Sequence, residues 1–453
     1  MNYPTESALL TDLYELTMLH VYYKEGMTGH AVFELFLHKR PDNRNFLIAA
    51  GLDQALDYLE NFAFTEDECQ WLDDSGRFDK DFIDILKEFT FTGDVYALPE
   101  GTIFFEKEPI IRIEAPLPEA QIVETRLINL LQFQSMIASK AVRSSIAAPG
   151  KLLVDFGLRR AHGAEAGMLA ARACYLAGFS GTSNVAASRL FDIPMFGTMA
   201  HSYIMAHDDE RQAFLNFAKA QPDNIVLLID TYDTESAAIK VIEVADQLQH
   251  LGLEVHAVRL DSGNISEHAC EVRKILEDGG HPEIGIFASS NLDEHVLEKM
   301  SKAGVPIDGF GIGTKIIVSE DVPFLDCVYK LQEYAGTPRY KQSEGKITLP
   351  GRRQIYRRYD QKGILDYDLI GLADKQQHGE PLLIKVMEQG KRVDAREPLQ
   401  EIRKRIDTQL KQLPEEFLSL HVSVESPIKI SDDIKALMDA DSIAQLCNTT
   451  GLS

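Results

Sequence analysis

The chain has 453 residues, of which 45% are hydrophobic, so it can build a large core in two or three domains or in a barrel with additions. Its formal net charge at pH 7 is −24, which excludes an extended nucleic-acid surface, because phosphate backbones require clustered Lys and Arg. Any anionic ligand must therefore meet a local cationic pocket.

The five cysteines are scattered, odd in number and without a C-x-x-C pair, so neither a disulfide framework nor a cysteine zinc site is expected. The opening letters MNYPTESALL lack the basic and apolar regions of a secretory signal, and no apolar run approaches the roughly 18 residues of a membrane helix. We therefore expect a cytoplasmic protein that binds neither membrane nor nucleic acid.

Residues 1–125 mix a helix with alternating strands, which is typical of an α+β domain. The pattern predicts a helix over residues 7–23 and strands over 30–39, 93–105 and 109–115. Tyr14 lies on the predicted helix. From the residues alone, a helical tyrosine indicates packing in a core or an interface.

Residues 126–335 are expected to form a catalytic α/β barrel. Seven short β-rich runs each end in small or polar residues, and they lie at 151–160, 178–184, 193–202, 224–233, 253–263, 283–291 and 307–315. Helical patterns over 234–251 and 265–280 alternate with them, as in parallel βαβ units. An open doubly wound sheet is the alternative. We predict an irregular TIM-like barrel because polar residues gather at nearly every strand's C-terminal end.

Residues 336–453 are strand-rich over about 340–390 and then helical over 397–413. We expect this C-terminal segment to pack with the N-terminal domain as one discontinuous α+β domain. The predicted domains are thus 1–125, 126–335 and 336–453.

The stretch FGTMAHSYIMAH runs from Phe196 to His207 and contains two histidines. His201 and His207 are six residues apart, which is not the i, i+4 spacing of a zinc-binding helix. His201 stands at the C-terminal end of a predicted strand, where it could act as a general base or a nucleophile. Taken alone, a core histidine with a satisfied ring is the simplest interpretation.

Two further strand ends carry residues suited to anions. In RLDSG, Arg259 and Asp261 face the same side of a strand, either as a salt bridge or as an anion site beside a hydroxyl or cation site. In GFGIGTK, Gly311 and Gly313 let backbone N–H groups approach a phosphate and Thr314 adds a hydroxyl, although the motif is not a Walker A sequence.

The densest group of cations in this acidic chain has two parts. DFGLRRAHG places Arg159 and Arg160 just past a strand, and SKAVRSS contributes Lys140 and Arg143. Their concentration at the presumed active face favours an anion-binding pocket, and solvated arginines are the alternative.

Taken together and in this order, the motifs resemble those of the nicotinate phosphoribosyltransferase family. The matching segments are LLTDLYELTM, PEGTIFF, PLPEAQIVETRLINLLQFQSMIASKA, DFGLRRAHG, GTMAHS, RLDSG, GIGTK, CVYKL and KITLPGRRQIYRR. Each is weak alone, and their shared order is what makes the resemblance specific. The family often continues RLDSG with an aspartate, and here Asn264 stands at that position.

The resemblance implies an enzyme of NAD biosynthesis or salvage that converts nicotinate and phosphoribosyl pyrophosphate to nicotinate mononucleotide and pyrophosphate. It also implies ATP hydrolysis coupled through a phosphohistidine, which His201 matches within the family's GT-x-AHS motif. Asp230 matches the carboxylate that fixes the tautomer of this histidine. Mg²⁺ is implied with ATP, and the sequence does not identify its ligands.

The resemblance further implies how the substrates are held. Nicotinate stacks between Tyr14 and Phe156, with Thr198 and Arg159 near its carboxylate, and Asp261 serves the ribose hydroxyls or Mg²⁺. The matching residues for the anionic groups and the 5-phosphate are Arg259, Lys140, Arg143, Gly311, Gly313 and Thr314. In the family the counterpart of Tyr14 crosses a dimer interface, so a homodimer with shared active sites is expected.

One position bears on the choice of pyridine. In SGTSNVA, Ser183 stands where related nicotinamide enzymes carry the aspartate of a GTD motif. A carboxylate would repel nicotinate, whereas a hydroxyl can donate to it, so nicotinate is the expected substrate. The alternatives are a nicotinamide phosphoribosyltransferase and a non-catalytic nucleotide-binding relative. A barrel lyase would need a Schiff-base lysine, for which Lys315 is the candidate.

Overall fold

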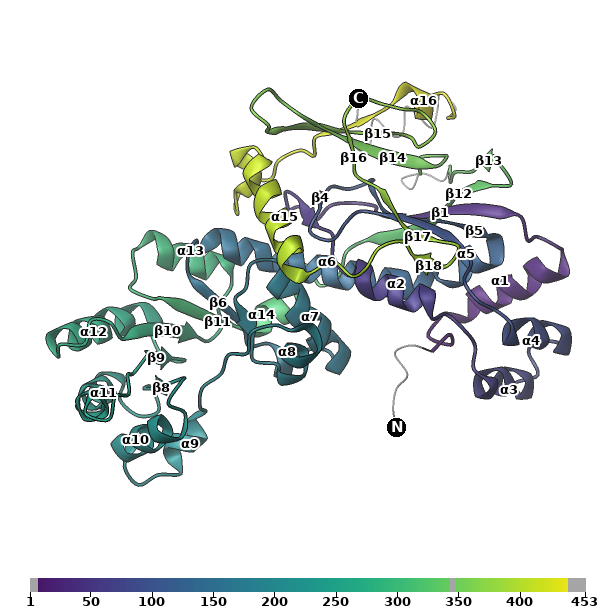
Figure 1. Ribbon diagram of the computed structural model, residues 1–453. Coiled ribbons are helices and arrows are strands. Elements are labelled where there is room, and N and C mark those ends of the chain that lie inside the picture. The colour runs from purple at the N-terminus through teal and green to yellow at the C-terminus, as the bar shows by residue number, and fades with distance from the viewer. Residues whose placement is uncertain (1–6, 343–347, 439–453) are drawn as a thin grey trace. The chain divides into compact units, whose positions relative to one another are not determined.

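The computed structural model describes residues 7–342 and 348–438, and the chain divides into two compact units (Figure 1). Residues 140–321 form the inserted unit, and residues 1–139 with 322–453 form the outer unit. These bounds differ from the predicted domains, because residues 126–139 and 322–335 belong to the outer unit. The predicted domains also included 1–6, 343–347 and 439–453, which lie outside the described residues.

The inserted unit is built on a six-stranded parallel sheet in the order β7-β6-β11-β10-β9-β8. Its strands are β6 (Leu152–Asp155), β7 (Gly181–Thr182), β8 (Val226–Leu228), β9 (Ala257–Leu260), β10 (Gly285–Ser289) and β11 (Gly309–Ile312). Each lies within one of the predicted runs, so the βαβ alternation predicted from the sequence is confirmed. Because all strands run the same way, their C-terminal ends meet at one edge, where chemistry is expected.

Helices follow the strands, and the residues just past the strand ends start several of them. Asp233 accepts a hydrogen bond from the Ser236 amide to cap α11 (Thr234–Gln249), and Asp293 accepts one from Val296 to cap α13 (Glu294–Lys302). Both predicted helices are present, as α11 and as α12 (Ile265–Asp278). The others are η1 (Leu158–Arg160), α7 (Ala164–Leu176), α8 (Val185–Phe191), α9 (His201–Met205), α10 (Glu210–Ala220) and α14 (Thr314–Ile317).

The run predicted as a strand over 193–202 forms only isolated bonds. The Phe196 amide donates to the Thr182 carbonyl at 3.0 Å, beside a single bridge of Met195 to β7. On the other side, the Thr198 hydroxyl donates to the Val226 carbonyl of β8. The segment thus touches both edge strands, but no ladder among the described strands closes the sheet. The predicted closed barrel is therefore observed as a six-stranded sheet.

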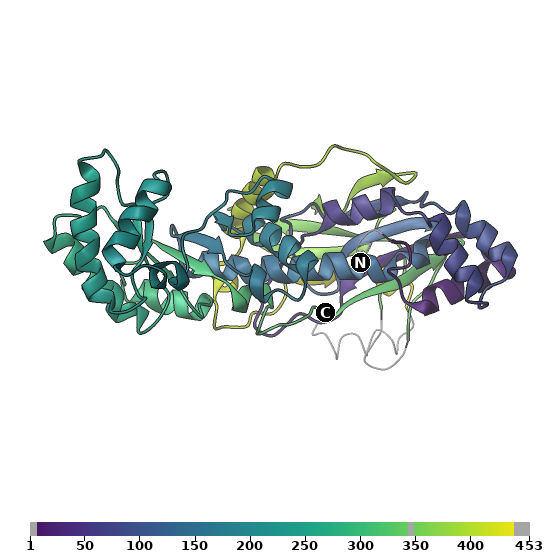
Figure 2. The ribbon, with the colours of Figure 1, turned by 90° about the horizontal axis from the view of Figure 1, so that it is seen from below.

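The outer unit contains a seven-stranded sheet in the order β13-β12-β1-β5-β3-β17-β18. The N-terminal segment supplies β1 (His30–Leu37), β3 (Asp94–Ala97) and β5 (Pro109–Pro116). The C-terminal segment supplies β12 (Cys327–Tyr334), β13 (Thr337–Pro338), β17 (Ile384–Glu388) and β18 (Lys391–Arg392). In Figure 2 the green strands of the second segment lie among the purple and blue strands of the first. The two segments therefore share one sheet.

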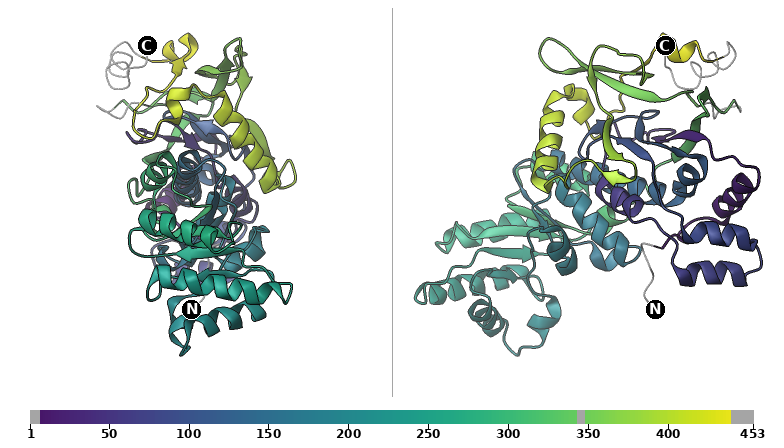
Figure 3. Two further views of the ribbon diagram at one scale, coloured as in Figure 1. Left: turned by 90° about the vertical axis from the view of Figure 1, so that its left-hand side faces the viewer. Right: turned by 45° about the vertical axis from the view of Figure 1, so that its right-hand side comes forward.

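A second sheet of the outer unit has the order β16-β14-β15-β19. Its strands are β14 (Arg353–Tyr359), β15 (Leu365–Leu372), β16 (Glu380–Pro381) and β19 (Ile428–Ile430), and β2 (Leu47–Ile48) pairs with β4 (Ile103–Phe104). The helices are α1 (Leu13–Lys24), α2 (Leu52–Glu60), α3 (Glu66–Asp74), α4 (Lys80–Lys87), α5 (Leu117–Ile122), α15 (Leu399–Gln412), η2 (Glu415–Leu418) and α16 (Asp432–Lys435). The right view of Figure 3 shows the purple helices of the N-terminal segment and the yellow-green helix α15. Helix α6 (Glu124–Ala147) runs across the boundary between the units.

Candidate active site

The C-terminal ends of β8, β9 and β10 bring a guanidinium, two carboxylates and a hydroxyl into one network. Arg259 donates from Nε to the Ser289 hydroxyl at 2.9 Å and from Nη2 to Asp261 Oδ1 at 3.0 Å. Its third contact is a donation from Nη1 to the Met199 carbonyl at 3.4 Å. The predicted facing of Arg259 and Asp261 is confirmed, and three acceptors fix the guanidinium before any ligand binds.

Asp230 supports this network from the end of β8. Its Oδ2 accepts from the Asp261 amide at 2.9 Å and from the Ser262 hydroxyl at 2.6 Å, so it holds the RLDSG turn in place. Its Oδ1 is buried and has no hydrogen-bond partner in the described part of the chain. A buried carboxylate oxygen without a donor is costly, so this atom is suited to a cation or a donor brought by a ligand.

His201 is the first residue of α9, and its imidazole lies within the same unit beside these strand ends. Its Nδ1 is 3.1 Å from the Thr231 hydroxyl, and its Nε2 is 3.8 Å from Asp261 Oδ2. The side chain is 37% exposed, so the ring is accessible and is not a core histidine. Thr231, which contacts the imidazole, directly follows Asp230, whose carboxylate bonds to Asp261 and Ser262 instead.

This arrangement differs from the expectation for Asp230. The sequence comparison assigned to Asp230 the contact that orients the imidazole, and the structure gives the contact to the Thr231 hydroxyl. Asp230 instead turns towards the backbone of the neighbouring strand end. Neither Thr231 nor Ser289 was singled out from the sequence, since a lone hydroxyl at a strand end carries no distinctive spacing.

Phe156 lies below the guanidinium of Arg259, whose Cζ is 5.4 Å from the ring centroid. The alternating glycines of β11 explain how the ring fits. A Cβ at Gly311 would lie 2.6 Å from the Phe156 ring, and one at Gly309 would lie 2.8 Å from the Phe287 ring. These two glycines therefore make room for aromatic side chains, a packing role that the phosphate hypothesis had not included.

The end of β11 and the neighbouring end of β10 have unusual backbone. Gly313 precedes α14, and a Cβ there would lie 2.9 Å from the Phe156 carbonyl oxygen, while Thr314 is exposed. Ser290 and Asn291, just past β10, have φ values of +92° and +42°. Left-handed conformations at residues other than glycine are uncommon and gather at ligand sites.

The ends of β6 and β7 carry the residues matched to the pyridine. Ser183 follows β7, and its amide donates to the Asp155 carbonyl at 2.9 Å. Asp155 is almost fully buried, and this burial raises the pKa of its carboxyl, which accepts from the Thr182 hydroxyl and the Gly157 amide. Arg159 is exposed on η1. The hydroxyl proton of Thr198 is already committed to the Val226 carbonyl.

Lys140 and Arg143 do not form the open cationic pocket that was expected. Both are buried, and both pair with Glu294, at 2.7 Å from Lys140 Nζ and 2.9 Å from Arg143 Nε. Lys140 also pairs with Asp321 at 2.9 Å. Burial by itself would raise the pKa of Glu294. Lys140 and Arg143 have the larger combined effect, so the pKa of this carboxyl is lowered. The pair therefore neutralises an internal carboxylate and leaves no unbalanced positive charge for a substrate.

Tyr14 lies on α1 of the outer unit and is 47% exposed. Burial of part of the ring raises the pKa of its hydroxyl, and Glu124 and Glu15 add to the shift. Three apolar neighbours are exposed with it, namely Leu10, Leu13 and Val21. Leu13 and Val21 lie on α1, and Leu10 precedes it, so α1 and its entry expose apolar side chains near Tyr14 in the sequence.

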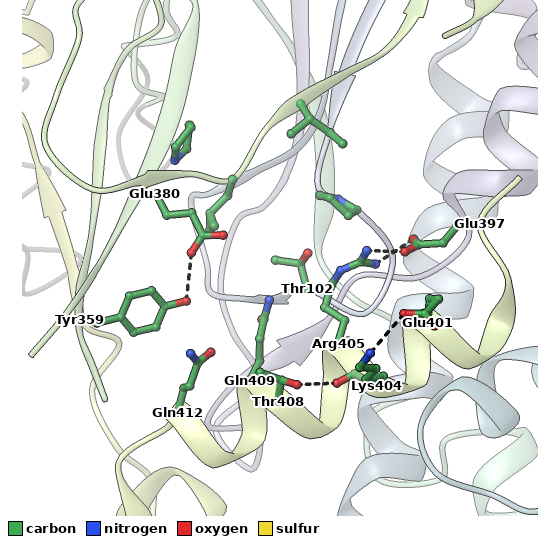
Figure 4. Close-up of a pocket in the computed structure, with 14 residues that line it drawn as sticks. Thr102, Tyr359, Glu380, Glu397, Glu401, Lys404, Arg405, Thr408, Gln409 and Gln412 are labelled. Carbon is green, nitrogen blue, oxygen red and sulfur yellow. Dashed lines mark hydrogen bonds and ion pairs between the residues drawn. The ribbon is translucent and has the colours of Figure 1, made fainter. Parts of the chain in front are cut away.

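The outer unit contains a cavity of about 440 Å³ between β14, β16 and α15 (Figure 4). Figure 4 shows that its charged side chains bind one another: Arg405 contacts Glu397, and Lys404 contacts Glu401. The Tyr359 hydroxyl is 3.3 Å from Glu380 Oε2. None of the predicted site residues lines this cavity, and its cations are already paired, so the strand-end network of the inserted unit is the candidate active site.

Within the described ranges, no group of three or more His, Cys, Asp and Glu side chains is arranged to hold a metal by itself. In the same residues, no helix is both long and apolar enough to cross a membrane.

Three family models match the chain. They are described as the nicotinate phosphoribosyltransferase (NAPRTase) N-terminal domain over residues 9–132, the nicotinate phosphoribosyltransferase (NAPRTase) family over 152–346, and the nicotinate phosphoribosyltransferase C-terminal domain over 375–438. The second match contains every strand of the inserted unit.

Curated proteins with similar sequences carry the same description. Nicotinate phosphoribosyltransferase pncB2 of Mycobacterium tuberculosis is 44% identical over 94% of this chain and 92% of its own length. Nicotinate phosphoribosyltransferase of Bacillus subtilis is 38% identical over 82% of this chain and 77% of its own length.

Two solved structures superpose over nearly the whole chain. Human nicotinic acid phosphoribosyltransferase has a TM-score of 0.85 at 28% identity and covers 94% of this chain and 99% of its own. Nicotinate-nucleotide pyrophosphorylase from Pyrococcus furiosus has a TM-score of 0.75 at 26% identity, covering 91% of this chain and 97% of its own.

Proposed function

The chain belongs to the nicotinate phosphoribosyltransferase family, and from this membership we infer the reaction that it catalyses. It converts nicotinate and phosphoribosyl pyrophosphate to nicotinate mononucleotide and pyrophosphate. The nicotinate ring nitrogen bonds to C1 of the ribose as the bond from C1 to pyrophosphate breaks. The observation that carries this conclusion is the 44% identity to a curated nicotinate phosphoribosyltransferase over 94% of the chain.

We propose that Arg259 and Asp261 serve the phosphoribosyl donor. The transfer develops positive charge on the ribose and negative charge on the leaving pyrophosphate, so catalysis depends on positioning and on neutralising the leaving group. Arg259 is held by Ser289, Asp261 and a backbone carbonyl, which orients its charge before the donor binds. Asp261 offers a carboxylate to the ribose hydroxyls from the same side of β9.

We propose that His201 accepts a phosphoryl group from ATP. The imidazole is accessible, one ring nitrogen is held by the Thr231 hydroxyl, and the other lies towards the cluster. In the step, a ring nitrogen bonds to the γ-phosphorus, the bond from that phosphorus to the bridging oxygen breaks, and ADP leaves with the electron pair. Hydrolysis of the phosphohistidine then couples ATP to the transfer.

The carboxylates at this edge fit Mg²⁺. The orphaned Oδ1 of Asp230 and the carboxylate of Asp261 are hard oxygen donors, and Mg²⁺ is commonly held by one or two carboxylates together with substrate phosphates and water. We propose these two residues as its holders. The ion would neutralise charge on the phosphates when it is bound.

The pyridine is proposed to lie against Phe156, with Ser183, Arg159 and Thr198 around its carboxylate. A hydroxyl at Ser183 can donate to an anionic carboxylate, which favours nicotinate over nicotinamide. The 5-phosphate is assigned to the turn after β11, where Gly311, Gly313 and Thr314 adjoin Ser290 and Asn291. The left-handed backbone past β10 supports a ligand-binding turn at this place.

We also propose three features of the protein as a whole: closure of the sheet, a homodimer and a cytoplasmic location. We infer that the segment at 194–198 closes the six-stranded sheet into an irregular barrel, since it bonds to both edge strands. We infer a homodimer in which α1 covers the partner's site, as the family resemblance implies, and the exposure of Tyr14 on α1 leaves its ring available for that contact. The described cysteines are free thiols, which fits the reducing cytoplasm.

One assay tests the proposal as a whole. Purified protein is incubated with Mg²⁺, ATP, phosphoribosyl pyrophosphate and radiolabelled nicotinate, with nicotinamide in a parallel reaction. We expect nicotinate mononucleotide and a rate that rises with ATP. Failure to form this product would overturn the activity, and faster turnover of nicotinamide would reverse the argument from Ser183.

A further inference from the structure

A buried carboxylate that the reaction itself does not use joins the two strand ends of the pyridine subsite. Asp155 is the last residue of β6, and its Oδ2 accepts from the Thr182 hydroxyl, the last residue of β7, at 2.7 Å. Its Oδ1 accepts from the Gly157 amide at 2.8 Å, and its carbonyl accepts from the Ser183 amide at 2.9 Å. Both sides of the subsite thus converge on one residue.

The network continues beyond Thr182. The Thr182 hydroxyl also accepts from the Asn184 amide at 3.0 Å, and Asn184 Oδ1 caps α8 by accepting from Ala187 at 3.2 Å. Thr182 and Asn184 are 0% and 1% exposed, so no water replaces these bonds without opening the core. A shift of the Thr182 hydroxyl would therefore move Ser183, which lies between them.

We propose that Asp155 is a positioning residue that sets Ser183 relative to Phe156 and so determines how tightly the enzyme holds the pyridine carboxylate. The inference rests on the proposed function and adds a residue to it. Phe156 directly follows Asp155. The hydrogen bond from the Gly157 amide to the Asp155 carboxylate fixes the turn that contains Phe156. Ser183 donates its amide to the Asp155 carbonyl, and Thr182, the residue before it, donates its hydroxyl to the Asp155 side chain.

A carboxylate is the side chain that this arrangement requires. Two donors, a hydroxyl and a backbone amide, approach the two oxygens of Asp155 from different strand ends. An asparagine would present one oxygen and one NH₂ group, so one of the two donors would face another donor. Burying the charged form of this carboxyl costs free energy, and the same burial raises its pKa.

The test compares two replacements of the hydroxyl that Asp155 holds. Thr182→Val is isosteric and removes the bond, whereas Thr182→Ser keeps the hydroxyl. We expect Thr182→Val to raise the KM for nicotinate roughly tenfold, the change that about 1.4 kcal/mol produces, and to lower the preference for nicotinate over nicotinamide. The KM for phosphoribosyl pyrophosphate and the labelling of His201 by ATP should stay within about twofold, and Thr182→Ser should restore the nicotinate KM.

A matched control separates positioning from a general loss of packing. Ser188→Ala removes a comparable hydrogen bond, from the Ser188 hydroxyl to the Ile193 carbonyl at 2.7 Å, without touching Asp155. It should leave both KM values unchanged. If Thr182→Val raises both KM values equally, or leaves the nicotinate KM unchanged while the wild type turns nicotinate over, the inference is overturned. Absence of turnover in the wild type would instead overturn the proposed function.

Discussion

The two units use the same pair of chemical groups in opposite ways. In the outer unit, Arg353 pairs with Glu34 at 0% exposure of both side chains, and Arg357 makes two hydrogen bonds to Asp368, at 2.9 and 2.6 Å. In the inserted unit, Arg259 pairs with Asp261 at 13% and 25% exposure. The former pairs are closed to solvent, and the latter keeps part of its charge available at a strand end.

This difference shows how a structural ion pair can be told from a functional one. The Arg353–Glu34 pair joins β14 of the C-terminal segment to β1 of the N-terminal segment, and the Arg357–Asp368 pair joins β14 to β15. Arg353 also donates to the Lys107 carbonyl and Arg357 to the Ile103 carbonyl. The Arg259 network instead adjoins an accessible imidazole and a carboxylate oxygen without a donor. Arg353 Nη2 of a buried pair also has no hydrogen-bond partner among the described residues, so exposure of the charged groups, rather than unused bonding capacity, distinguishes the candidate site.

The largest effect is expected from replacing His201, the proposed phosphoryl acceptor of the accessible cluster. His201→Asn should abolish acid-labile phosphate incorporation from labelled ATP, because the amide that replaces the imidazole is not a nucleophile at neutral pH. Slow transfer uncoupled from ATP should remain, since the Arg259 network is untouched. Labelling of the variant at the wild-type level would place the acceptor on another residue.

The direct comparison of the two kinds of pair comes next. Arg259→Leu should lower kcat/KM by roughly 10²- to 10³-fold, the usual effect of removing a transition-state contact, with little change in unfolding. Arg357→Leu should instead cost about 3–5 kcal/mol of stability, because it strands the buried Asp368. Urea denaturation and steady-state kinetics of both variants check this. Equal losses of stability would remove the distinction between the two units.

A smaller effect on the KM for nicotinate is expected from Tyr14, whose exposed ring on α1 contrasts with the buried ion pairs of the same unit. Tyr14→Ala should raise the KM for nicotinate roughly tenfold if the ring stacks on the pyridine, and Tyr14→Phe should keep most of the affinity. An unchanged KM in the alanine variant would argue against stacking.

The last prediction concerns stability at one pH range only, with no change in activity, and it rests on the neighbouring Glu15. This residue is fully buried, and burial raises the pKa of its carboxyl to about 7. Between pH 4.5, its ordinary value, and about 7 the unfolded chain releases this proton before the folded chain does, so stability falls as pH rises through that window. Glu15→Gln should therefore add roughly 2 kcal/mol at pH 8 and little at pH 5. Glu25→Gln, an exposed site just past the same helix, is the control. A gain of the same size at both pH values would contradict the assignment.

Much of the inserted unit could be predicted because its periodicity is local. The strands and helices of a βαβ unit are adjacent in sequence, so the runs over 224–233, 253–263 and 283–291 predicted strands that share one edge of a parallel sheet. Closure of that sheet was harder to foresee. The segment around Pro194 has the apolar letters of a strand, but proline lacks an N–H for a ladder, and only isolated bonds form there.

Contacts in the candidate site could be predicted where the two residues lie close together in sequence, and not where the partner lies far along the chain. Arg259 in β9 and Asp261 just past it bond to each other, as expected for residues two apart that point to the same side of an extended segment. Lys140 and Arg143 were expected to face a substrate, because the sequence gives no sign that Glu294, about 150 positions later, pairs with both of them and that Asp321 pairs with Lys140 as well. Thr231, Thr182 and Asp155 act through contacts between strand ends that no local spacing reveals.

The ion pair between Lys140 and Asp321 joins the first and last residues of the inserted unit. The two points at which the chain leaves and rejoins the outer unit are therefore held together by this ion pair. A long insertion whose ends are held together adds little to the entropic cost of closing the chain in the outer unit, since that cost grows only with the logarithm of loop length. The outer fold can thus carry a catalytic insertion of this size, and changes of length at the tips of that insertion, without a matching penalty to its own assembly.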